Sequence, residues 1–175
     1  MGRRNAIWLG LLCAQGGKAV HTACTRRGGW ALKVYLPVAF VAFVAATTGA
    51  DLFASISIGG EPFAAALREH FYWASVQFVG TLFLLVPFVA VALIGALVER
   101  RARQRSATLI FAMGMLTLLY FYFQGYQAAE HAMLAKRWTA ASLSIGLIPF
   151  FIGVPVVLAA GVAGAVAASF DRRNV

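Results

Sequence analysis

Two Glu-His dipeptides are the residues of this sequence whose types could do chemistry. They are Glu69-His70 and Glu130-His131, and each stands at one end of a long apolar stretch. A carboxylate beside an imidazole can act as general acid and base, and histidines with carboxylates can bind zinc, copper or iron. Two histidines on adjacent helices can also ligate a haem. Adjacent helical residues point about 100° apart, so the dipeptides lack the spacing by which His-x-x-x-His chelates one ion.

A stripe of polar side chains lies along the segment that ends at His131. Hydrocarbon offers amide groups no hydrogen-bond partner, so glutamines on such a stripe need partners on another helix. The members, which fall within an arc of roughly 80° on a helix, are Met113, Thr117, Tyr120, Gln124, Gln127 and His131.

The composition identifies an integral membrane protein. The chain has 175 residues, of which 61% are hydrophobic and only 12% charged, whereas a soluble domain carries about 25% charged residues. Four apolar stretches reach the roughly 20 residues that cross a bilayer. The sequence therefore predicts an all-α protein, a four-helix transmembrane bundle with short loops that contacts the lipid bilayer.

The elements follow from hydropathy and turn residues. A basic arm, flexible or interfacial, is expected over residues 1–32, and the transmembrane domain over residues 33–173. Gly59-Gly60 and Pro62 predict a loop, after which Phe63, Leu67 and Phe71 mark one face of a short helix on the membrane surface. The predicted spans cover residues 34–52, 71–98, 107–127 and 141–168.

Charge predicts the orientation. Twelve of the fifteen Lys and Arg lie in the arm and at the adjoining Lys33, in the loop at residues 99–105 or in the C-terminal tail. Because basic loops stay on the cytoplasmic side, we expect both termini in the cytoplasm and the protein in the cell's inner (plasma) membrane. The net charge of +9 is then an orientation signal, and no nucleic-acid partner is expected. Cys13 and Cys24 form no CxxC motif and are expected to be free thiols.

Counting from the loop at residues 99–105 matches residues in depth. His70 lies 32 residues before Ala102 and His131 lies 29 after it, so their depths differ by only about 4–5 Å at 1.5 Å per residue. Gln77 and Gln124 match in the same way. We therefore predict an outer-leaflet polar site between the second and third spans. Its intramembrane members are Gln77, Tyr120, Gln124 and Gln127, and its outer-face members are Asp51, Glu69, His70, Glu130 and His131.

Small residues predict close helix packing in the fourth span. Ala160, Gly164 and Ala168 form a small-xxx-small pattern, and Gly153 and Gly161 add to the same surface. Such a surface can serve the bundle itself or contact another membrane protein or a second copy.

Three functions fit these patterns. The first is a non-enzymatic subunit or interaction protein acting through helix contacts, since the size and four-span layout resemble those of immunity proteins against pore-forming toxins and of small respiratory-complex subunits. The second is a small oligomeric transporter or channel. The third is a haem- or metal-binding redox subunit with His70, His131 and Glu130 as candidate ligands, although no cofactor is the simplest expectation. GxSxG, HExxH, P-loop and GxGxxG motifs are absent, which favours a protein that is not an enzyme.

Overall fold

The computed structural model describes residues 32–102 and 104–173, and these form helices joined by short turns, with no strands. Four of the helices are long and apolar enough to cross a membrane. The predicted all-α bundle with four spans is thereby confirmed. The basic arm lies outside the described residues except for Leu32, and so do Cys13 and Cys24.

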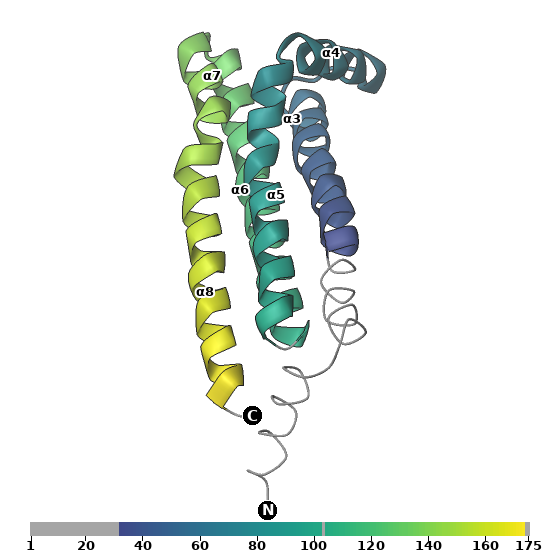
Figure 1. Cartoon of the computed structure of the whole chain (residues 1–175). Coiled ribbons are helices and arrows are strands. Elements are labelled where there is room, and N and C mark those ends of the chain that lie inside the picture. Colours follow the sequence, from purple (N-terminus) through teal and green to yellow (C-terminus); the bar gives the residue numbers. More distant parts are fainter. Residues whose placement is uncertain (1–31, 103, 174–175) are drawn as a thin grey trace, which may run out of the picture.

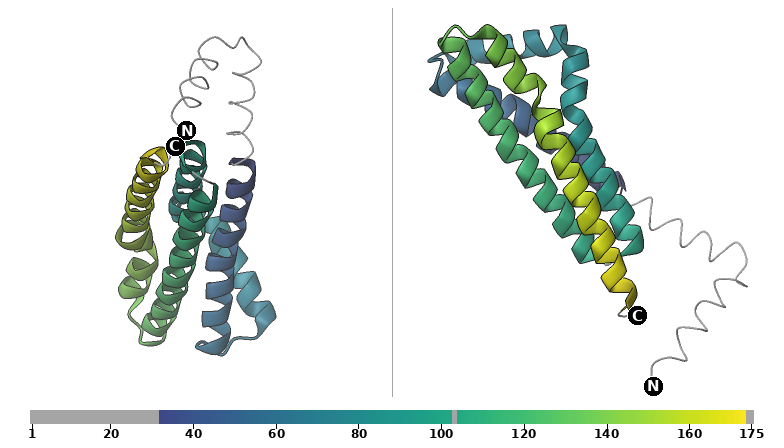
Figure 2. Two further views of the ribbon diagram at one scale, coloured as in Figure 1. Left: turned by 90° about the horizontal axis from the view of Figure 1, so that it is seen from below. Right: turned by 90° about the vertical axis from the view of Figure 1, so that its left-hand side faces the viewer.

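The first span is Leu32–Ser57. It contains a π-helical turn, η1 (Ala45–Gly49), and ends as α3 (Ala50–Ser57). The other spans are α5 (Phe78–Arg101), α6 (Gln104–Leu134) and Pro149–Asp171, which begins as the π-helical turn η2 (Pro149–Gly153) and continues as α8 (Val154–Arg173). Helix α6 contacts α3, α5, α7 and α8 and is the centre of the bundle (Figures 1 and 2).

A helix lies across one end of the bundle (Figure 1). It is α4 (Phe63–Val76), which follows an extended Pro62 and ends at Gln77. Gln77 has φ −102° and ψ 39°, so the helix axis turns there before α5 begins. The predicted surface helix thus runs to Val76, and the second span starts at Phe78 rather than at Phe71.

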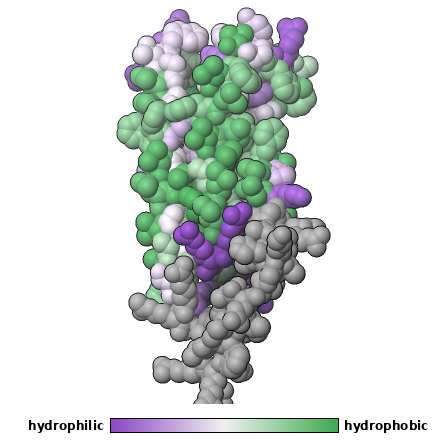
Figure 3. All heavy atoms as spheres, in the orientation of Figure 1, coloured by the Kyte–Doolittle hydropathy of each residue, from purple (hydrophilic) through white to green (hydrophobic). Residues whose placement is uncertain are grey.

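Apolar residues form a belt around the middle of the bundle, and hydrophilic residues gather toward its two ends (Figure 3). One end carries α4 and the turn between α6 and α7 (Trp138–Gly146); the other carries the α5–α6 loop and the end of α8 (Figure 1). This distribution is typical of a membrane protein whose middle part is surrounded by lipid hydrocarbon.

The core is filled by aromatic and aliphatic side chains. Its largest fully buried members are Tyr122, Phe88, Leu118 and Val91. Phe88 packs edge-on against Tyr122 with ring centroids 5.0 Å apart, and against Phe43 at 5.6 Å. These contacts join the first, second and third spans.

A hydrogen bond to the backbone of α5, in the turn before Pro87, explains why a tyrosine can be buried in this core. Pro87 has no N–H, so the carbonyl of Phe83, four residues before it, has no helical donor. The Tyr122 hydroxyl donates to the carbonyl oxygen of Leu84, three residues before Pro87, at 2.7 Å. A side chain of the third span is thereby hydrogen-bonded to the backbone of the second span in the turn before the proline.

Tyr122→Phe is therefore expected to lower the free energy of unfolding by roughly 0.6–1.7 kcal/mol, the worth of a hydrogen bond between membrane helices. Unfolding in mixed micelles at increasing denaturing detergent measures the change. Tyr120→Phe is the matched control, because Tyr120 is 59% exposed and its hydroxyl bonds no other described residue. Equal effects of the two substitutions would contradict the assignment.

Candidate functional site

The turn before α4 brings that helix back over the first span. Gly60 adopts a φ of +72°, which glycine does without steric cost. Pro62 then begins α4 in the extended conformation with ψ 139°. As a result α4 starts beside α3 and lies against it.

Two polar residues of the first span face this helix. Thr48 belongs to η1 and Asp51 to the first turn of α3. Residues three apart on a helix lie on the same side, so the hydroxyl and the carboxylate form one polar face. π-Helical turns are frequently found at functional sites.

His70 of α4 binds both of them. Its Nδ1 lies 2.7 Å from Asp51 Oδ2, and its Nε2 lies 3.0 Å from Thr48 Oγ1. With a neutral ring, Nδ1–H donates to the carboxylate and the Thr48 hydroxyl donates to Nε2. The His70 side chain is 12% exposed and that of Asp51 is 28% exposed. We call Thr48, Asp51 and His70 the α4 clamp.

Glu130 of α6 lies next to the clamp. A Cβ built on Gly59 would stand 2.9 Å from Glu130 Oε1, so the carboxylate packs on the turn before α4. The charges of Asp51, Glu61 and Glu69 all act on it. The third span thus supplies a carboxylate to the same end of the molecule.

The predicted outer-face residues are only partly brought together. Asp51 and His70 are bonded directly, and Glu130 lies within electrostatic range of Asp51. Glu69 instead accepts a hydrogen bond from Trp73 Nε1 at 3.2 Å on the exposed side of α4. His131 is exposed. The clamp joins the first span to α4, whereas the predicted site lay between the second and third spans.

The predicted intramembrane members form no hydrogen-bonded cluster. Gln77, Tyr120 and Gln124 are exposed and Gln127 is half-buried. Within residues 32–102 and 104–173, no hydrogen bond joins their side chains to one another. The second and third spans meet instead through small residues: a Cβ on Gly114 would stand 2.7 Å from Val91 Cγ1, and one on Gly95 would stand 3.3 Å from Phe111 Cβ.

Of the candidate metal ligands His70, His131 and Glu130, the structure engages His70 in other bonds. Both ring nitrogens of His70 are engaged by the clamp, so neither is free to ligate an iron or zinc ion in this geometry. In the described part of the chain, no three His, Cys, Asp or Glu side chains gather as a metal site.

The small residues of the fourth span divide into two sets. Gly153 packs on Pro87 and Gly164 on Val98, both of α5, and Ala160 is buried. Gly161 has no other side chain within 4 Å of an added Cβ, and Ala168 is half-buried. Much of the small-residue surface is therefore used within the bundle.

Thr48 is the clamp residue that the sequence analysis did not single out. A signal was present, because Thr48 and Asp51 are polar residues one turn apart at the end of an apolar span.

Comparison of the chain with protein-family models, with curated proteins and with solved structures finds no match.

Proposed function

We propose that this chain is a non-enzymatic interaction protein of the inner membrane, working as a subunit or an immunity-like partner of another membrane protein. The observation that carries the proposal is the clamp, which fixes α4 across the end of the bundle while aromatic side chains of α4 stay exposed. A rigid helix that presents aromatic groups is a surface suited to recognition.

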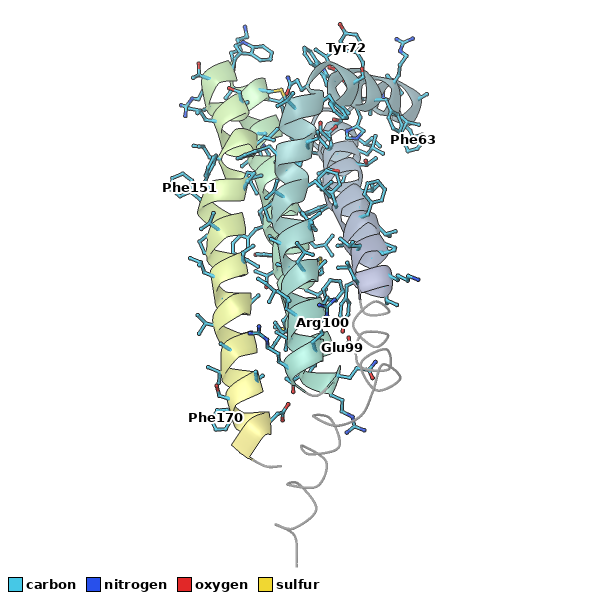
Figure 4. The ribbon with its side chains drawn as sticks, viewed as in Figure 1. Phe63, Tyr72, Glu99, Arg100, Phe151 and Phe170 are labelled. Carbon is cyan, nitrogen blue, oxygen red and sulfur yellow. The ribbon has the colours of Figure 1, made fainter. Side chains whose placement is uncertain are left out.

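Three consecutive aromatic residues make the surface. Phe71 and Tyr72 are each 61% exposed and Trp73 is 49% exposed. Because consecutive residues point about 100° apart, lipid headgroups can cover only some of them. Tyr72 extends from the side of α4 that faces away from the bundle (Figure 4). A protein partner would cover this side.

The interior of the bundle favours interaction over transport by a single copy. Its core consists of packed apolar and aromatic side chains. Thr47 is the buried polar residue of the described core, and its hydroxyl bonds to the Phe43 carbonyl of its own helix at 2.9 Å. A hydrophilic path would need groups that can replace hydration, whereas the buried side chains of the described residues other than Thr47 are aliphatic or aromatic.

The charge distribution supports an outward-facing α4. The end opposite α4 carries Arg100, Arg101 and Arg105, and basic loops remain cytoplasmic. In this orientation both termini are cytoplasmic and the partner is met at the outer surface.

Photo-crosslinking in native membranes tests the proposal. With p-benzoylphenylalanine in place of Tyr72, we expect a discrete adduct with one membrane protein. The matched control is the same group in place of Leu109, which is 65% exposed and lies near the opposite end of α6. No protein adduct from position 72, or the same adduct from both positions, would refute recognition through α4.

A further inference from the structure

A shallow, open apolar groove follows α7 and the π-helical turn after it. Its volume is about 470 Å³. It forms where α7 ends at Gly146 and η2 begins at Pro149, and Phe151 extends from it away from the bundle (Figure 4). The lining residues are Ala140, Leu143, Leu147, Ile148, Phe151 and Ile152.

Two basic residues precede the end of the groove that begins at Ala140. Lys136 and Arg137 directly precede α7, and both are exposed. Arg137 is three residues before Ala140, a rise of roughly 4.5 Å along a helix. Among the described residues, no carboxylate lies within ion-pairing distance of either. The positive charge next to the groove is therefore unneutralised.

The backbone at Lys136 is strained. Its φ is 57°, and it is the one non-glycine residue with positive φ in the part of the chain that the structure describes. The turn is a Schellman motif, since the Arg137 N–H bonds to Ala132 O at 2.8 Å and the Lys136 N–H bonds to Met133 O at 2.9 Å. Glycine is the usual residue at this position. The left-handed conformation disfavours residues that carry a side chain. The presence of a lysine there therefore points to a role for its charged side chain.

The groove has the length of an acyl chain in one leaflet. Ala140 of α7 and Phe151 of η2 are eleven residues apart, which corresponds to roughly 16 Å at the rise of an α-helix. Half of the hydrocarbon core of a bilayer is about 15 Å thick. A chain lying in the groove would thus reach the bilayer centre when its headgroup is level with Arg137.

We propose that this groove binds one anionic phospholipid from the leaflet at the α4 end. An acyl chain lies along Leu143, Leu147 and Phe151, and Lys136 and Arg137 bind the phosphate. The two unneutralised cations favour an anionic lipid over a zwitterionic one, because the ammonium group of the latter would meet like charge.

Thermal unfolding of the full chain in detergent with added lipid tests the site. We expect phosphatidylglycerol to raise the unfolding midpoint by about 2–4 °C more than phosphatidylcholine does. The double variant Lys136→Gly/Arg137→Gln keeps the Schellman turn and should lose this difference. Leu147→Trp covers an exposed part of the groove and should also lose the difference between the two lipids.

Arg68→Gln is the matched control, since it removes one exposed basic residue from the same end of the molecule. It should keep the full difference between the lipids. The proposal is overturned if the two lipids act equally on the unaltered chain, or if Arg68→Gln abolishes the difference as the double variant does. It is also overturned if glycerol 3-phosphate alone produces the whole shift, because the acyl chain would then contribute nothing.

Discussion

His70→Ala should free α4 from the first span while the four-span bundle stays folded. The substitution removes both clamp bonds and leaves the Asp51 carboxylate, 28% exposed, without its partner. Hydrogen bonds that involve a charged group are worth about 1.5–3 kcal/mol. Because each 1.4 kcal/mol is a factor of ten, amide exchange in α4 should accelerate roughly 10- to 150-fold. Hydrogen–deuterium exchange of the protein in nanodiscs measures this rate.

His131→Ala is the matched control for this experiment. It removes the same side chain from the same end of the molecule, but His131 is exposed on α6. We expect exchange in α4 to change less than twofold. If both variants accelerated exchange equally, the clamp would not be what holds α4.

Gly153→Ala should destabilise the bundle strongly for a change of one methyl group. A Cβ at Gly153 would overlap the ring of Pro87, and a proline ring has no rotamer by which to move aside. The second and fourth spans would have to separate, and overpacking of this kind costs about 1–3 kcal/mol. Unfolding in mixed micelles measures the loss.

Gly161→Ala is the contrasting change on the same helix. Nothing lies within 4 Å of an added Cβ there, and alanine is favoured over glycine inside a helix by about 0.5–1 kcal/mol. We therefore expect a neutral or stabilising effect. Destabilisation of the same size at both positions would show that the fourth span packs differently from this structure.

The helices could be predicted from the sequence because hydropathy and turn residues are local signals. Gly59-Gly60 and Pro62 marked the start of α4 correctly. The end of α4 could not be read in the same way, because the aromatic residues Phe71, Tyr72 and Trp73 are also typical of the interfacial start of a span. The corner at Gln77 depends on one pair of backbone angles, φ −102° and ψ 39°, and on the packing of α4 against α3.

The site was harder to predict because it depends on that corner. Matching His70 with His131 in depth assumed that the second span continued straight through Phe71. Since α4 instead turns across the bundle, His70 meets Thr48 and Asp51 of the first span. Asp51 and His70 could be chosen from residue type alone, whereas their pairing and the part of Thr48 required the direction of α4.

The clamp is tested most directly by a double-mutant cycle between Asp51 and His70, with exchange protection of α4 as the readout. If the two side chains bond as described, Asp51→Ala should cost little more once His70→Ala is present, with a coupling of about 0.5–3 kcal/mol. Fully additive effects of Asp51→Ala and His70→Ala would contradict the clamp, and with it the account of how α4 is held in place.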